Sequence, residues 1–155
     1  MRSILIPFFF LIFGCNEKPP ADLHLLNVYQ KNKATFKILR DMMCGDRYKY
    51  IYSSDKSDPE NIPELKLRTY LRLLKEVEGV LISKSDKCNI SISTWEFGRK
   101  ISGGPSKSKG FIMNPDQWNA ELVDSLDEQY KKRKSEAFFH RKIDNDWYLY
   151  YYDFQ

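Results

Sequence analysis

Apolar residues recur at a spacing of three to four along two segments in the first half of the chain. The first covers residues 22–43, where Asp22 suits a helix N-cap and the polar Asn32 interrupts the apolar stripe once. The second covers residues 63–79 and stops at Gly79, a residue typical of helix ends. Because this spacing places apolar side chains on one face, the sequence predicts two amphipathic helices.

Beyond these helices the apolar spacing falls to two, which is the period of a half-buried strand. The alternation predicts three short strands, at residues 80–82, 89–95 and 110–114. Residues 118–132 return to helical spacing, with Leu122 and Leu126 on one face. Residues 48–52 fit either a strand or an extension of the first helix.

The strongest strand signals lie at the C-terminus, in residues 136–143 and 147–154. Between them the polar residues 144–146 predict a hairpin turn. A three-residue turn sets the register, so that Arg141 lies opposite Leu149. Side chains of this hairpin then alternate between a more hydrophobic face, which should pack on the helices, and a second face.

The second hairpin face combines aromatic rings with polar tips, a composition that suits a protein contact. We predict that it binds a partner through six residues: Phe138, His140, Lys142, Tyr148, Tyr150 and Tyr152. The alternative is that another element, such as the predicted helix 118–132, covers this face and makes it a second core.

Taken together, the patterns predict one α+β domain over residues 22–155. In this architecture two N-terminal helices pack on an antiparallel sheet of four or five strands that ends in the C-terminal hairpin.

The chain begins with one positive charge, Arg2, and ten apolar residues at 4–13, followed by Gly14 and Cys15. Ten helical residues span roughly 15 Å, about half of a bilayer core, so this segment is too short for a permanent membrane span. The layout is typical of a secretory signal. The stretch Ile12-Phe13-Gly14-Cys15 resembles the lipobox of bacterial lipoproteins.

This resemblance implies that residues 1–14 are a cleaved signal peptide and that Cys15 is acylated. Residues 15–21 would then form a lipidated tether. Asn16 is not the aspartate that retains such proteins in the inner membrane, so the resemblance implies an outer-membrane lipoprotein facing the periplasm.

The remaining two cysteines are Cys44 and Cys88. In an oxidising compartment they are expected to form a disulfide, and two separately buried thiols are the alternative. A metal site would need more soft ligands, and only His24 and His140 supply imidazole, so we expect neither a metal nor a cofactor.

The net charge is +4, from 25 basic and 21 acidic side chains that are interspersed along the chain. Interspersed charge predicts no nucleic-acid surface. The glycine- and lysine-containing segment 103–110 fails the spacing of a phosphate-binding loop and is expected to be an exposed basic hairpin. No Gly-x-Ser-x-Gly motif is present, and His140 has no second histidine near it in sequence.

The sequence therefore favours a lipid-anchored, non-enzymatic binding protein that faces the periplasm. Its most concrete form is a small toxin-neutralising or enzyme-inhibiting lipoprotein. The alternative is a structural or assembly accessory of an envelope complex, and a hydrolase with a scattered site is a third class.

Overall fold

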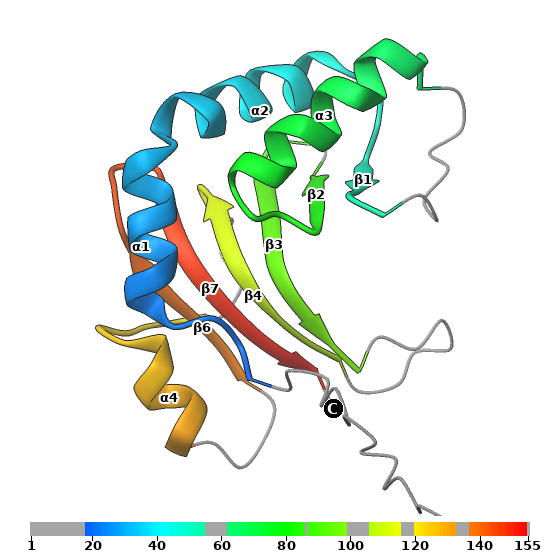
Figure 1. Cartoon of the computed structure of the whole chain (residues 1–155). Helices are drawn as coiled ribbons and strands as arrows, with labels where there is room; N and C mark the ends of the chain where they lie inside the picture. Colours follow the sequence, from blue (N-terminus) through cyan, green and yellow to red (C-terminus); the bar gives the residue numbers. More distant parts are fainter. Residues whose placement is uncertain are drawn as a thin grey trace, which may run out of the picture.

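Four helices cover one face of a curved sheet in the computed structural model (Figure 1), which describes residues 18–54, 62–85, 87–98, 106–115, 120–132 and 137–154. The predicted signal peptide and Cys15 lie outside the described residues. The helices are α1 (Asp22–Lys31), α2 (Lys33–Gly45), α3 (Glu64–Glu76) and α4 (Leu126–Lys132). The strands are β1 (Tyr50–Tyr52), β2 (Leu81–Lys84), β3 (Ile90–Phe97), β4 (Ser106–Met113), β5 (Glu121–Leu122), β6 (Ala137–Lys142) and β7 (Trp147–Phe154).

The strands form one sheet in the order β1-β2-β3-β4-β7-β6-β5. Its neighbours are antiparallel except for β5 and β6, which run parallel. The predicted α+β class is therefore confirmed, but the predicted sheet of four or five strands is too small. The sequence left edge strand β1 undecided and missed edge strand β5; these strands are only three and two residues long, too short to show a clear alternation.

The predicted first helix is two helices, because the chain breaks at Asn32. This residue has φ −119° and ψ 24°, and its side-chain amide donates to the carbonyl oxygen of Val28 at 2.9 Å. A side chain that bonds to nearby backbone competes with helix continuation. Both halves still bury the predicted stripe, through Leu25 and Val28 before the break and Phe36 and Leu39 after it.

The end of α3 shows why Gly79 follows it. Glu78, rather than the glycine, takes the left-handed conformation, with φ 56°. The Gly79 N–H donates to the Leu74 carbonyl at 2.8 Å, the arrangement of a Schellman motif. A Cβ at Gly79 would lie 2.8 Å from the Leu74 side chain and 2.9 Å from Ile92, so the glycine is needed for close helix–sheet contact.

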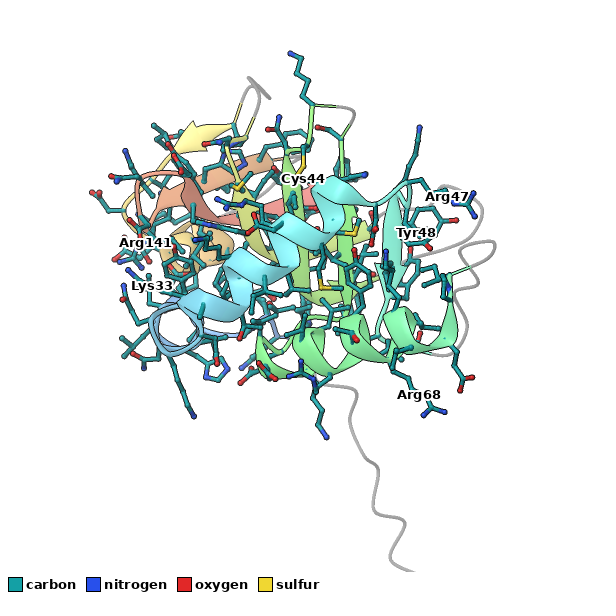
Figure 2. The ribbon with its side chains drawn as sticks, turned by 90° about the horizontal axis from the view of Figure 1, so that it is seen from above. Lys33, Cys44, Arg47, Tyr48, Arg68 and Arg141 are labelled. Carbon is teal, nitrogen blue, oxygen red and sulfur yellow. A yellow bond between two sulfur atoms is a disulfide. The ribbon has the colours of Figure 1, made fainter. Side chains whose placement is uncertain are left out.

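Helices α2 and α3 lie side by side over the sheet (Figure 2). Hydrogen bonds join them: Thr35 Oγ1 donates to Glu76 at 2.9 Å, and Asp46 at the end of α2 accepts from the Tyr70 hydroxyl at 2.8 Å and from Lys66 Nζ at 2.6 Å. Beneath them, the largest core rings come together from both layers, and Phe36 lies edge-on to Phe111 with ring centroids 4.7 Å apart. The main core is therefore the space between the helices and one sheet face.

Two predictions between the glycine-rich segment and the final hairpin need correction. Strand β4 begins at Ser106, so Lys109 lies in a strand and is 1 % exposed, and segment 106–110 is not an exposed hairpin. Residues 103–105 lie outside the described residues. Of the helix predicted over residues 118–132, residues 118 and 119 lie outside the described residues, and within 120–132 the helix starts at Leu126.

In the same region, β5 pairs with β6. Leu122 of β5 is 69 % exposed, so it does not share an apolar helix face with Leu126 as predicted. Ser125 marks the true helix start, because its Oγ accepts the Glu128 N–H at 3.3 Å. The open choice over residues 48–52 is decided in favour of a strand, since β1 pairs with β2.

The C-terminal hairpin has the predicted register, with Arg141 opposite Leu149. Its turn is tied to the helices by Asp144, whose Oδ2 accepts hydrogen bonds from the Tyr29 hydroxyl at 3.1 Å and from Lys33 Nζ at 2.9 Å. The hydrogen bond from Lys33 lowers the pKa of Asp144 to about 2. The turn that sets the register is thus held by both the local chain and the helix layer.

Candidate functional site

The six residues of the predicted contact surface lie on the sheet face opposite the main core. We call them the aromatic face: Phe138, His140, Lys142, Tyr148, Tyr150 and Tyr152. Cross-strand pairing brings them together, with Tyr152 opposite Phe138, Tyr150 opposite His140 and Tyr148 opposite Lys142. The structure therefore assembles all six as alternation along the two strands predicts.

Burial divides the aromatic face into an inner and an outer set. Tyr150 is 2 % exposed, and His140 and Tyr152 are also buried. Phe138 and Tyr148 are partly exposed, and Lys142 is exposed. The inner rings belong to a second, smaller apolar cluster with Ile112 of β4. The predicted helix 118–132 was the alternative cover for this face, but its helical part, α4, packs into the main core through Leu126.

Hydrogen bonds fix the inner set. The Tyr150 hydroxyl and Ser93 Oγ are 2.7 Å apart, and so are His140 Nε2 and the Tyr152 hydroxyl. The rings of Tyr150 and Tyr152 have centroids 4.5 Å apart. Gly110 lies opposite Tyr150 in β4 and allows β3 to approach closely, because a Cβ at Gly110 would overlap the carbonyl oxygen of Ile92 in the neighbouring strand.

The inner set is electrically neutral at neutral pH. Burial lowers the pKa of His140 to about 4, because the imidazolium would lose its hydration. Burial also raises the pKa of Tyr150 to about 12 and moves the pKa of Tyr152 well above its ordinary value. His140 is therefore a weak base whose Nε2 already shares a hydrogen bond.

Sequence reasoning missed two further tyrosines on the same sheet face, Tyr50 and Tyr52. The register runs across the sheet from Tyr50 through Ser83 and Ser91 to Ile112 of β4, and from there to Tyr148. The hydroxyls of the two serines are 2.8 Å apart. A strand over residues 48–52 would place Tyr50 and Tyr52 on one face, but the same residues also fit a helix, so only the pairing of β1 with β2 assigns them to this face.

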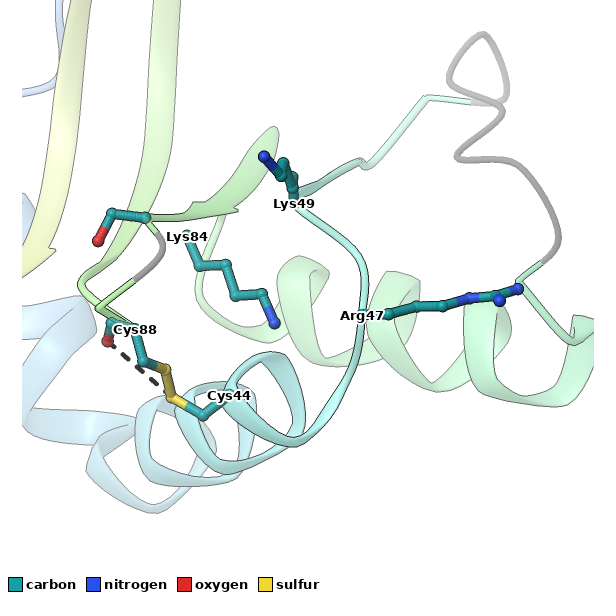
Figure 3. A pocket seen from close by; sticks show the side chains of 6 residues that line it. Cys44, Arg47, Lys49, Lys84 and Cys88 are labelled. Carbon is teal, nitrogen blue, oxygen red and sulfur yellow. Dashed lines mark hydrogen bonds between the residues drawn. A yellow bond between two sulfur atoms is a disulfide. The ribbon is translucent and has the colours of Figure 1, made fainter.

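Cys44 and Cys88 lie at disulfide distance, with Cα atoms 5.5 Å apart. They line a pocket of about 260 Å³ with Arg47, Lys49, Lys84 and Ser85 (Figure 3). Lys84 Nζ is committed to the end of α2, where it donates to the Met43 carbonyl at 2.7 Å and to the Asp46 carbonyl. Arg47 points away from the other two cations (Figure 3), so the pocket does not gather positive charge on one point.

A buried charge cluster joins the start of α1 to α4 and the sheet. Lys109 Nζ lies 2.7 Å from Asp22 Oδ1 and 2.7 Å from Asp127 Oδ1. Arg141 Nη1 is 3.1 Å from Asp22 Oδ2, and the Leu126 N–H donates to the same oxygen at 2.8 Å. Asp22 is therefore not the predicted N-cap, a place taken by Ala21, and its carboxylate instead binds outside its own helix.

Burial alone would raise the pKa of Asp127, but hydrogen bonds from Lys109 and from the Asp22 N–H outweigh it and the pKa is lowered. No periodic pattern in the sequence marks this cluster, since its members lie up to 119 positions apart.

The described residues contain no helix long and apolar enough to cross a membrane. Within the same residues, no group of three or more His, Cys, Asp or Glu side chains has the arrangement of a metal site. A scan of protein-family models found no match to this chain, and searches of curated proteins and of solved structures found none either.

Proposed function

We propose that the mature chain is a lipid-anchored, non-enzymatic binding protein that faces the periplasm and contacts a protein partner through the aromatic face. One observation carries the proposal: the aromatic face has an outer set, partly exposed at Phe138 and Tyr148 and exposed at Lys142, that rests on a hydrogen-bonded inner set. Contact residues held in place before binding lose little conformational entropy when the partner arrives.

The outer set has the composition of a contact surface. Tyr148 and Phe138 offer large apolar area with few rotatable bonds, and Lys142 supplies an exposed charge at the rim. Phe154, which is exposed at the end of β7, extends the surface, with its ring centroid 5.1 Å from that of Phe138.

The electrostatics of the inner set favour binding over catalysis. A general base works best with a pKa near the working pH, and the pKa of His140 lies at about 4. Tyr150 stays protonated at neutral pH because its pKa is raised to about 12. This neutral, hydrogen-bonded layer is suited to supporting a contact surface.

The anchor rests on the N-terminal layout, from the charged Arg2 to the lipobox-like stretch ending at Cys15. The cysteine pair at disulfide distance supports an oxidising compartment. Within this proposal, the finer form is a lipoprotein that neutralises a toxin or inhibits an enzyme.

Site-specific photo-crosslinking in the periplasm tests the contact. A photoreactive amino acid at Tyr148 or Lys142 should capture a partner, whereas the same group at Lys75, exposed on α3 in the helix layer, should not. Capture of an envelope-complex subunit would favour the assembly-accessory alternative over an inhibitor.

With the photoreactive amino acid moved to Phe154, which extends the same surface, a double change of Tyr148→Ala with Lys142→Ala should abolish capture while leaving the melting temperature close to that of the wild type. Equal capture from all three positions, or retention of capture in the double variant, contradicts the assignment of this face.

A further inference from the structure

The point at which the tether leaves the folded domain is fixed by the charge cluster. Asp22, the first residue of α1, is 3 % exposed, and its N–H donates to Asp127 Oδ2 at 2.9 Å. Its carboxylate is bound to Lys109 and Arg141. The Leu126 N–H also donates to this carboxylate, so four contacts with α4 and the sheet hold the first helical residue and the tether starts from a rigid base.

The chain length places this base close to the membrane if Cys15 carries lipid. Lys18 lies three positions after Cys15, and an extended chain spans at most about 10 Å over that distance. Pro19 and Pro20 favour an extended chain of roughly 3.1 Å per residue, so Asp22 lies within about 22 Å of the anchor.

A surface depression of about 400 Å³ lies at this base and is lined by residues from both sides of the charge cluster: Lys18, Pro19, Ala21, Asp127, Tyr130 and Lys131. Helix α4 and the start of α1 lie at the same end of the molecule (Figure 1). Leu23, one residue into the helix beyond Asp22, is 69 % exposed. Leu23 is two residues from Ala21, which lines the depression, so an apolar side chain is exposed to water near this base.

The charge of this surface is positive at its rim. The carboxylate of Asp127 is paired with Lys109, which offsets it. Lys18 and Lys131 are exposed, and among the described residues neither has a carboxylate within ion-pair distance. Lys132 lies farther along α4, 3.9 Å from Glu128.

We infer that this tether-base surface, made by Lys18, Leu23, Tyr130 and Lys131, docks on the anionic phospholipid of the membrane that holds the anchor. The inference rests on the proposed lipid anchor at Cys15. Lysines near an anionic leaflet are attracted to its surface, and a tyrosine and an exposed leucine suit the headgroup boundary. Docking would hold the domain in one orientation, with α4 toward the lipid.

Fluorescence quenching on the acylated full chain tests the inference. A fluorescent amino acid replaces Leu23 and, as a matched control, Leu65, which is 80 % exposed on α3. The vesicles are phosphatidylcholine with a headgroup-linked quencher, with or without one quarter phosphatidylglycerol. We expect quenching at Leu23 only in the anionic vesicles, and none at Leu65 in either.

The lysines are tested in the same assay. Each lysine should contribute a factor of about 5 to the ratio of docked to undocked protein. The double variant Lys18→Gln with Lys131→Gln should therefore reduce this ratio about 25-fold. Lys31→Gln with Lys75→Gln removes the same charge at the far ends of α1 and α3 and should leave quenching unchanged.

Intact mass and vesicle flotation distinguish failure of the docking surface from failure of the lipid anchor. A chain that carries lipid and floats with both vesicles, but shows equal quenching at Leu23 in both, overturns the docking surface and leaves the anchor standing. Equal loss of quenching in the two lysine pairs overturns it as well. A chain without lipid at Cys15 that does not float overturns the anchor and the inference with it.

Discussion

Replacing Lys109 with methionine tests the charge cluster that fixes the start of α1. Methionine keeps most of the apolar stem and removes only the ammonium group. In the native protein the Lys109 side chain is 1 % exposed, and its ammonium group lies 2.7 Å from oxygens of both Asp22 and Asp127. The change therefore leaves two carboxylates close together without the cation between them.

Breaking a buried ion pair by removing one partner costs about 3–5 kcal/mol. The lower end applies here for two reasons. Asp22 keeps Arg141 at 3.1 Å and the Leu126 N–H at 2.8 Å, and Asp127 is 37 % exposed and can turn toward water. We expect Lys109→Met to reduce the free energy of unfolding at neutral pH by about 3 kcal/mol, which a typical domain can lose without unfolding.

The pH dependence of this loss has a definite sign. In the wild type the pKa of Asp127 is lowered, so its stabilisation is present above the ordinary carboxylate pKa and is lost as pH falls through the folded value. In the variant, repulsion raises the pKa of one of the two carboxylates, and protonation relieves it. The stability gap between wild type and Lys109→Met should therefore narrow as pH falls below about 4.

Urea denaturation at neutral and at acidic pH, with the cysteine pair oxidised, measures the effect. Lys37→Met, at an exposed position on α2, is the control and should change stability by less than about 0.5 kcal/mol. Lys109→Met with Asp127→Asn should recover part of the loss, because one carboxylate is gone. A loss below about 1 kcal/mol, or an equal loss at both pH values, refutes the proposed energetics of the cluster.

Three further perturbations follow from the structure. Changing Cys44 and Cys88 to alanine should lower the free energy of unfolding by about 4 kcal/mol, because a disulfide with a sequence separation of 44 closes a long loop in the unfolded chain. Reductant should then have no further effect on the urea midpoint of the variant. Glu78→Gly should stabilise the protein by about 0.5–1 kcal/mol in the same assay, by relieving φ 56°, whereas Glu78→Ala should not. Because the pKa of His140 falls to about 4 on folding, the stability of the wild type should decline as pH falls from about 6.5 to about 4. Thermal melts of His140→Gln should lack this part of the decline. If the variant and the wild type show the same pH profile, the result argues against burial of a neutral imidazole.

The sequence alone determined the features that depend on local geometry. The apolar spacing located both N-terminal helical segments, and the three-residue turn at 144–146 set the hairpin register that brings Phe138 opposite Tyr152. These are local properties, because a side chain's direction follows from the helical or extended period and a short turn fixes which residues face each other. The sequence also singled out Cys44 and Cys88, the pair that lies at disulfide distance.

Only the tertiary structure decided which polar groups are buried and what they contact. The sequence predicts that Lys109 belongs to an exposed basic segment, but in the folded protein its ammonium group lies between Asp22 and Asp127. Tyr148 and Tyr150 are alike by alternation, but the second is buried against Ser93 and the first is not. An ion pair or a buried hydroxyl depends on distance in space and on exclusion of water, and neither is encoded in the spacing of residues along the chain.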